Sequence, residues 1–296
     1  MATVYSQAEN NIRKTWLLVG SLSFLTLGIG WVLSYLYHSW WILAIVGIWV
    51  ILEDFYAYWR ADKLVLRSVG AVPLTKEEAP ELHRIIENLC ITSGLPQPRL
   101  YIMEESQPNA FATGRDKNHA AIIVTRGLLD QMDRNELAGV IAHELSHVKN
   151  KDILLGTVVV VLVGVISFLA YWSFRLGFPR GSRDRKQGDV IFLLVGLIGL
   201  IFAPLAAAII QASISRKREF LADASGVLLT RYPEGLISAL QKIGGYKNSM
   251  KKAKMNTAHL FIASPFRGKS RKSWLTRLFD THPPLEERIR RLEITK

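Results

Sequence analysis

The sequence predicts an α-helical membrane protein in which two hairpins of membrane helices alternate with the two halves of an α+β domain. The chain is unusually apolar, with 49% hydrophobic residues and a mean hydropathy of +0.17. The apolar residues are concentrated in long uncharged runs, and the segments between the runs show the helix and strand patterns of a soluble domain. We therefore expect four transmembrane helices in two hairpins. The expected boundaries are 1–62 for the first hairpin, 63–152 for the first part of the domain, 153–214 for the second hairpin and 215–296 for the second part.

The first uncharged run lies between Lys14 and Glu53. One membrane crossing needs about 20 residues, so this run is long enough for two helices. We place them at about Trp16–Tyr37 and Trp41–Trp59, joined by a short tip. A cleaved signal peptide is the alternative, but the apolar core of such a peptide is only about 7–15 residues long.

The second pair of runs follows Asp152. Ile153–Phe174 is uncharged, and 190–213 belongs to another uncharged stretch, which contains Pro204. Each run is long enough to span a bilayer. Buried core helices are the alternative, although such helices seldom contain about 20 consecutive apolar residues.

The net charge of +12 would suit a nucleic-acid-binding protein if the chain were soluble. Here most Lys and Arg residues flank the apolar runs or lie in the C-terminal part, where anionic lipid head groups are the simpler partner. We expect the lipid bilayer to be a partner and nucleic acid not to be one. The single cysteine, Cys90, excludes an intrachain disulfide and suits a reducing compartment.

The first part of the domain shows the pattern of a helix followed by a small sheet. Thr75 and Glu78 form a capping-box pattern before an amphipathic helix. Extended segments are expected at 99–103, 109–114 and 119–125. The resulting sheet is either a packing platform or a sheet whose edge pairs with an extended peptide.

A helix from about Arg134 to Asn150, preceded by the capping-box pattern of Asp133 and Glu136, carries the first candidate functional residues. On this helix His143 and His147 share one face, one turn apart, and two imidazoles at this spacing are typical ligands of catalytic zinc. Glu144 is then free to act on a water molecule. The alternative is a chance H-E-x-x-H on an ordinary amphipathic helix, which is rare in a chain with 7 His in 296 residues.

A second pair of candidates directly follows the last apolar run. Glu219 and Asp223 are four residues apart and share a helical face, so Glu219 can supply the third zinc ligand while Asp223 accepts a hydrogen bond from a ligand imidazole. Two carboxylates on a basic helix are more often a solvated face. Their position favours the functional interpretation, because a membrane hairpin would return them to the side where the helix of His143 ends.

These motifs together resemble those of the HtpX-like membrane zinc endopeptidases and of their relatives, the zinc-dependent prenyl-protein endopeptidases. The matching segments are His143-Glu144-Leu145-Ser146-His147, Arg218-Glu219-Phe220-Leu221-Ala222-Asp223, Asn109-Ala110-Phe111-Ala112 and Thr281-His282-Pro283-Pro284, and with the apolar runs the match covers nearly the whole chain. The resemblance implies a gluzincin-type fold, one zinc ion bound by His143, His147 and Glu219, and Glu144 as the catalyst. It also suggests Asn109 near the cleft and His282 as a group that stabilises the oxyanion.

The resemblance further implies a multi-pass protein of the cell membrane whose catalytic domain faces the cytoplasm. Its role would be the quality control of misfolded or membrane proteins. The loop Arg175–Lys186 departs from this arrangement, because its basic residues would lie outside, against the usual bias toward positive charge inside.

The expected reaction is the hydrolysis of peptide bonds. Zinc lowers the pKa of its bound water toward about 7, and Glu144 takes the proton as general base and later returns it to the leaving amine. One alternative is a membrane transporter or scaffold with a non-proteolytic zinc site, and another is an amidase for soluble substrates. Structural zinc sites normally have four protein ligands, often Cys, which disfavours the first alternative.

The segment Asn109–Thr113 is the one expected to hold substrate. An exposed strand edge offers main-chain groups to any extended peptide, which suits an enzyme that cleaves many unfolded sequences. In an extended segment, Ala110 and Ala112 face one side and leave room for substrate side chains, while Phe111 faces the core. The alternative is a tight loop beneath the helix of His143.

Overall fold

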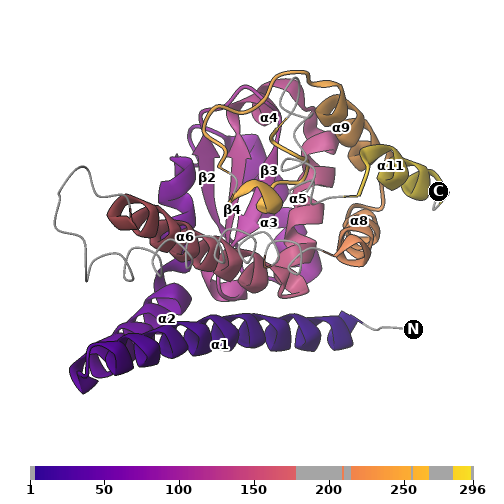
Figure 1. The fold of residues 1–296 in the computed structure, drawn as a ribbon. Coiled ribbons are helices and arrows are strands. Elements are labelled where there is room, and N and C mark those ends of the chain that lie inside the picture. Colours follow the sequence, from indigo (N-terminus) through magenta and orange to yellow (C-terminus); the bar gives the residue numbers. More distant parts are fainter. Residues whose placement is uncertain (1–3, 178–208, 210–214, 255, 267–282, 295–296) are drawn as a thin grey trace.

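The first two helices of the protein form a hairpin, and the C-terminal end of its second helix packs against the sheet (Figure 1). They are α1 (Val4–Leu36) and α2 (Trp40–Val69), and His38 turns the chain between them with a left-handed backbone (φ 50°). Large apolar side chains are exposed along both helices, Trp31 and Trp49 among them. The computed structural model describes residues 4–177, 209, 215–254, 256–266 and 283–294.

Among the described residues, one helix is long and apolar enough to cross a membrane by itself, at Glu9–Tyr35. α2 reaches the required length only if Trp40–Tyr56 and Tyr58–Val69, which are bent by 69°, count as one span. α6 (Asp152–Gly177) begins where the sequence predicts the third span, and its apolar part contacts α1 and α2. Apart from Ile209, the expected fourth span lies outside the described residues. The arrangement of four spans in two hairpins therefore stays a prediction.

The α+β domain is built on a four-stranded sheet of order β1-β2-β4-β3. The strands are β1 (Val72–Pro73), β2 (Arg99–Met103), β3 (Ala110–Thr113) and β4 (Ala121–Thr125). β2 and β4 are parallel, while β1 and β3 are antiparallel to their neighbours, so β3 is one edge of the sheet. The three predicted extended segments are the three longer strands. β1 is missing from the sequence prediction because two residues are too few to show a period of two.

Helices cover both faces of this sheet. On one face Ala112 and Ile122 pack under α3 (Pro80–Ser93) and α5 (Arg134–Lys149). On the other face Phe111 and Ile123 belong to a cluster with residues of α2, α6 and the segment around Phe261. The ring centroids of Phe111 and Phe261 are 4.8 Å apart. The sheet is therefore buried on both sides, which fits its apolar strands.

Four further α-helices belong to the described part of the domain. They are α4 (Arg126–Gln131), α8 (Arg216–Thr230), α9 (Pro233–Gly245) and α11 (Leu285–Ile294). α8 and α9 both pack against α5, and α11 packs on α9 and α8 (Figure 1). Two halves of the domain that are far apart in sequence thus meet along α5.

The two predicted capping boxes have different outcomes. Asp133 and Glu136 exchange both expected hydrogen bonds and start α5, which ends within one residue of the predicted boundary. Thr75 and Glu78 also exchange their hydrogen bonds, but these close a separate turn. α3 begins later, at Pro80, because the fixed φ of proline suits the first helical position.

Candidate metal centre

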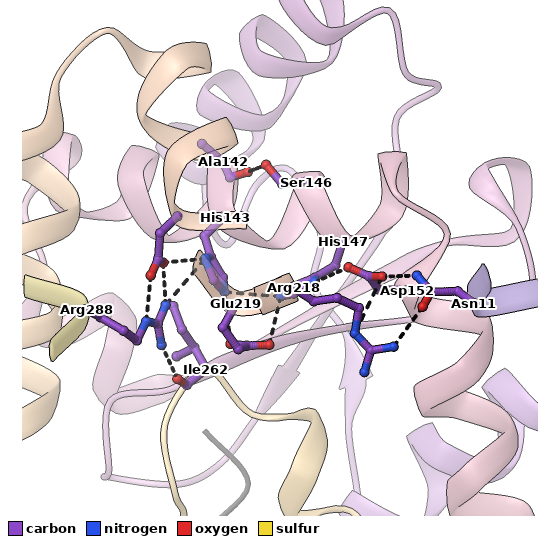
Figure 2. A network of polar contacts seen from close by, with 11 residues as sticks. Asn11, Ala142, His143, Ser146, His147, Asp152, Arg218, Glu219, Ile262 and Arg288 are labelled. Carbon is purple, nitrogen blue, oxygen red and sulfur yellow. Dashed lines mark hydrogen bonds and ion pairs between the residues drawn. The ribbon is translucent and has the colours of Figure 1, made fainter. Parts of the chain in front are cut away.

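His143 and His147 lie one turn apart on α5, and their rings meet at the two Nε2 atoms (Figure 2). These two nitrogens are 3.2 Å apart. The side chain of His143 is fully buried, and that of His147 is 15% exposed. The capping box of α5 and its burial against the sheet fix the helix that carries both rings.

A carboxylate orients each imidazole through its Nδ1 atom. Nδ1 of His143 lies 2.9 Å from Oδ1 of Asp223 on α8, and Nδ1 of His147 lies 2.9 Å from Oδ2 of Asp152. A proton held on Nδ1 by a carboxylate leaves the lone pair of Nε2 available to a metal ion. The two Nε2 atoms face one place.

Asp152 reaches His147 because the chain turns sharply between α5 and α6. Lys151 has a left-handed backbone with φ 58°, which costs a non-glycine residue about 1–2 kcal/mol. Residues five apart would not share a face of one continuous helix. The break in the helix at Lys151 therefore places the carboxylate of Asp152 next to the imidazole of His147.

Glu219, from the first turn of α8, faces the two histidines. Its Oε2 atom is 3.9 Å from Nε2 of His143, and its Oε1 atom is 3.7 Å from Nε2 of His147. His143, His147 and Glu219 each offer one possible ligand atom, and these three atoms all lie within 4.8 Å of one another. Two imidazole nitrogens and one carboxylate oxygen form a donor set of catalytic zinc sites, which keep one more position for water. The residues present therefore fit a zinc ion.

The backbones of α8 and α5 approach closely at Gly226. A Cβ atom at this position would lie 3.0 Å from the backbone nitrogen of His143 and 3.3 Å from the carbonyl carbon of Ala142. Any side chain here would press on backbone that cannot easily move. Glu219 lies two turns earlier on the same helix, so this contact helps to set its distance from the histidines.

The carboxyl group of Glu144 is buried beside the three possible ligands. Burial raises the pKa of Glu144 to about 7, although the charge of His147 and a hydrogen bond from the backbone N–H of Ala112 oppose this rise. A group whose pKa lies near neutrality can both accept and release a proton at physiological pH.

The two imidazoles differ in their preferred charge. Burial lowers the pKa of His143 to about 4, so this ring is neutral at pH 7. Burial also disfavours the charged form of His147, but the hydrogen bond to Asp152 and the charge of Glu219 outweigh it and raise the pKa of His147 to about 9. A metal ion binds an unprotonated imidazole, so a metal ion at this site would compete with the proton of His147.

Arg288 from α11 is a buried member of the site that sequence reasoning missed. Its Nε and Nη2 atoms donate to the two carboxylate oxygens of Asp223 at 2.9 and 2.6 Å, and its Nη1 atom donates to the carbonyl oxygen of Ile262 at 2.8 Å. A signal was present in the sequence: Arg288 lies three residues after Leu285 and four before Leu292, on the apolar face of the helix.

The predicted substrate segment is a strand at the edge of the sheet, and its side chains alternate as expected. One expectation is wrong: the small residues do not leave room for substrate. Ala110 is fully buried and Ala112 is only 6% exposed, because the side that they share lies against α5. The small side chains therefore allow the helix to approach the sheet.

Part of the β3 edge is already paired. The carbonyl oxygen of Ala110 accepts a hydrogen bond from the backbone N–H of Ile262 at 2.9 Å. The side chain of Asn109 donates to the carbonyl oxygen of Ala263 at 2.9 Å and is buried. The backbone N–H of Ala112 faces Glu144 instead. Ala112 is therefore the part of this edge nearest to the candidate metal site.

The structure thus brings together five of the residues that the sequence singles out: His143, Glu144, His147, Glu219 and Asp223. Figure 2 labels His143, His147 and Glu219. His282 lies outside the described residues. Asp152, Arg288 and Asn11 join the site without having been predicted.

Comparisons with known proteins agree on one family. The model of Peptidase family M48 matches residues 76–296. The chain is 47% identical to a Protease HtpX homolog of Thermoanaerobacter pseudethanolicus, over 98% of this chain and 97% of that protein. It is 44% identical to a Protease HtpX homolog of Thermococcus kodakarensis, over 94% of each.

A solved structure supports the fold. The crystal structure of S. mikatae Ste24p superposes with a TM-score of 0.50 at 18% sequence identity, covering 98% of this chain and 67% of that chain. The family match and the near full-length relatives together establish that the chain belongs to Peptidase family M48 and is a metalloprotease.

Proposed function

We propose that this metalloprotease hydrolyses peptide bonds with a zinc ion held by His143, His147 and Glu219. The observation that carries the proposal is the convergence of two Nε2 atoms and one carboxylate, with the buried Glu144 carboxyl beside them. Zinc in this place supplies a Lewis acid that polarises a peptide carbonyl and acidifies a water molecule. Two observations favour a protease over a transporter or scaffold with a zinc site. The chain matches a peptidase family, and its donor set of three ligands keeps a position for water.

The protein's own groups have distinct tasks in this reaction. Glu144 takes a proton from the attacking water and later returns it to the leaving amine. Asp223 and Asp152 hold the two imidazoles in the tautomer that directs Nε2 into the site. His282 would stabilise the oxyanion, and the support for this role is the resemblance of the Thr281-His282-Pro283-Pro284 motif alone.

We further propose a multi-pass protein of the cell membrane, with the catalytic domain on the cytoplasmic side and with unfolded or membrane proteins as substrates. The span Glu9–Tyr35 and the exposed apolar side chains of α1 and α2 support a place in the bilayer. β3 is an edge strand of the sheet, and the main chain of an edge strand can pair with an extended peptide of any sequence, which suits substrates of varied sequence.

The first experiment is proteolysis of an unfolded protein by the detergent-purified chain, with and without a zinc chelator. We expect cleavage that the chelator abolishes and that added zinc restores. Glu144→Gln should bind zinc and lose activity by a factor of about 10²–10⁴, the usual contribution of a general base. Glu87→Gln, an exposed glutamate on α3, is the matched control and should cleave at the wild-type rate. Wild-type cleavage by zinc-loaded Glu144→Gln would contradict the assignment.

A further inference from the structure

Asn11 lies in the first turns of α1, the helix that contains the membrane span, yet its side chain is buried beside the metal centre (Figure 2). Its Nδ2 atom donates to Oδ1 of Asp152 and, at 3.5 Å, to the carbonyl oxygen of Asn150. Its Oδ1 atom accepts a hydrogen bond from Nη1 of Arg218 at 2.9 Å. One amide group thus contacts two other segments of the domain.

The two partners that Asn11 contacts through their side chains, Asp152 and Arg218, adjoin possible metal ligands. The second oxygen of Asp152 lies 2.9 Å from Nδ1 of His147. Arg218 directly precedes Glu219, and its Nε atom is 3.9 Å from Oδ1 of Asp152. Asn11, Asp152 and Arg218 therefore form a closed polar ring around one side of the site.

The chemistry of an amide fits this ring. The carboxylate of Asp152 needs a donor and the guanidinium of Arg218 needs an acceptor, and Asn offers one of each on a short side chain. Without the amide, the Asp152 carboxylate would lose the donor that helps to direct its other oxygen to His147. Groups that hold a ligand imidazole in this way typically change metal affinity 10–100-fold when they are altered.

We propose that Asn11 is a positioning residue of the metal centre. Through Asp152 and Arg218 it fixes the orientation of His147 and Glu219, so the docking of the first membrane helix on the catalytic domain sets the affinity for zinc. This inference rests on the proposed zinc site.

The test measures zinc affinity of the full-length protein in detergent by competition with a chromophoric chelator. Asn11→Ala should bind zinc about 10–100-fold more weakly than the wild type. Asn10→Ala, the same change at an exposed position of the same helix, should bind zinc like the wild type. The visible absorption spectrum of the Co²⁺-loaded protein reports ligand geometry, and it should change in Asn11→Ala and not in Asn10→Ala.

A second pair of variants covers the case in which Asn11→Ala folds poorly. Arg218→Ala should also weaken zinc binding, and Lys217→Ala, at an exposed neighbouring position, should not. Because Asn11 and Arg218 act through one ring, the double variant should lose less affinity than the product of the two single losses.

Two outcomes would overturn the inference, and they are distinguishable. If the wild type binds zinc and Asn11→Ala binds it equally well with an unchanged cobalt spectrum, Asn11 has no positioning role and the proposed function stands. If the wild type itself binds no zinc, the proposed function fails and the inference fails with it.

Discussion

Asp223 contacts two different groups: the imidazole of His143, which is a possible metal ligand, and the guanidinium of Arg288, which is a buried cation. Burial alone would raise the pKa of Asp223, but the charge of Arg288 and the hydrogen bond with His143 lower it to about 2. The carboxylate therefore orients a possible ligand and also neutralises a fully buried cation. Replacing it affects both functions.

We expect Asp223→Asn to weaken zinc binding by roughly 10–100-fold and to lower the free energy of unfolding by about 3–5 kcal/mol, since it leaves the charge of Arg288 uncompensated. Zinc titration and thermal denaturation measure the two effects separately. Adding Arg288→Met to Asp223→Asn should recover part of the stability and none of the zinc affinity. A double variant less stable than Asp223→Asn would show that the buried charge is not the cause.

Glu219→Ala is expected to behave differently from Asp223→Asn. It removes a possible ligand, so only two protein donors remain, and such a site holds zinc poorly. Both zinc content and proteolysis should be lost, while the melting temperature of the metal-free protein should change little. Unchanged zinc content in Glu219→Ala would require a different third ligand.

Residues with a local sequence signal could be predicted, and residues placed by packing could not. His143, Glu144 and His147 follow from helical spacing within a few residues. Asp152 could not be placed, because its contact with His147 depends on the left-handed turn at Lys151. Asn11 had no signal at all, since it meets Arg218 only through the docking of one helix against two distant segments.

At the scale of elements, the start of α5 is held by more than its capping box. The buried carboxylate of Glu136 accepts hydrogen bonds from Nζ of Lys242 and the hydroxyl of Ser238, both on α9, at 2.6 Å. Burial disfavours its charged form, but these hydrogen bonds outweigh burial and lower the pKa of Glu136 below 4.5. A group whose pKa is lower in the folded state stabilises the fold above its unfolded pKa and loses this effect as the pH falls through the folded value.

Glu136→Gln should therefore lower the free energy of unfolding by about 1–2 kcal/mol at pH 7. The difference from the wild type should shrink as the pH falls below about 4.5, the ordinary pKa of a glutamate in the unfolded chain. Melting temperatures at pH 7 and pH 4 measure this, with the exposed Glu87→Gln as control. A difference that does not depend on pH would exclude the charge of Glu136 as the cause.

The paired edge of β3 leads to a prediction about stability. Ile262→Pro removes the N–H that pairs with the carbonyl oxygen of Ala110, and Ile262→Ala removes the same side chain but keeps that N–H. Because Ala110 is fully buried, its carbonyl oxygen would have no donor in Ile262→Pro. An unpaired buried acceptor costs about 1–3 kcal/mol, so the free energy of unfolding should be lower by about this amount for Ile262→Pro than for Ile262→Ala in denaturation experiments. Equal stabilities would mean that this hydrogen bond does not hold the segment of Ile262 to the sheet.

The elements themselves were largely predictable, because strands and helices carry their own periodicity. The order of the strands was not, since nothing local in β1 or β3 says which strand each one pairs with. For the same reason the pairing of Ile262 with Ala110 could not be predicted: the two residues are far apart along the chain, and nothing in either segment indicates the other as its partner.

At the scale of the whole molecule, the proposed topology can be tested with described positions. His38 lies at the tip of the α1–α2 hairpin, and Thr92 is exposed on α3. In a chain with Cys90→Ala, an impermeant thiol reagent applied to intact cells should label His38→Cys and leave Thr92→Cys unlabelled. The opposite pattern would place the catalytic domain outside the cell.

The candidate metal centre is divided along the chain. His143, Glu144 and His147 precede α6, whereas Glu219 follows it and Arg288 lies near the C-terminal end of the described chain. Ribosomes add roughly 5–20 residues per second, so on the order of ten seconds separate the synthesis of His147 from that of Arg288. During this interval the growing chain has no complete site. The order of synthesis thus keeps the protease inactive until Arg288, and with it the helices α6 and α8 that precede it, has left the ribosome.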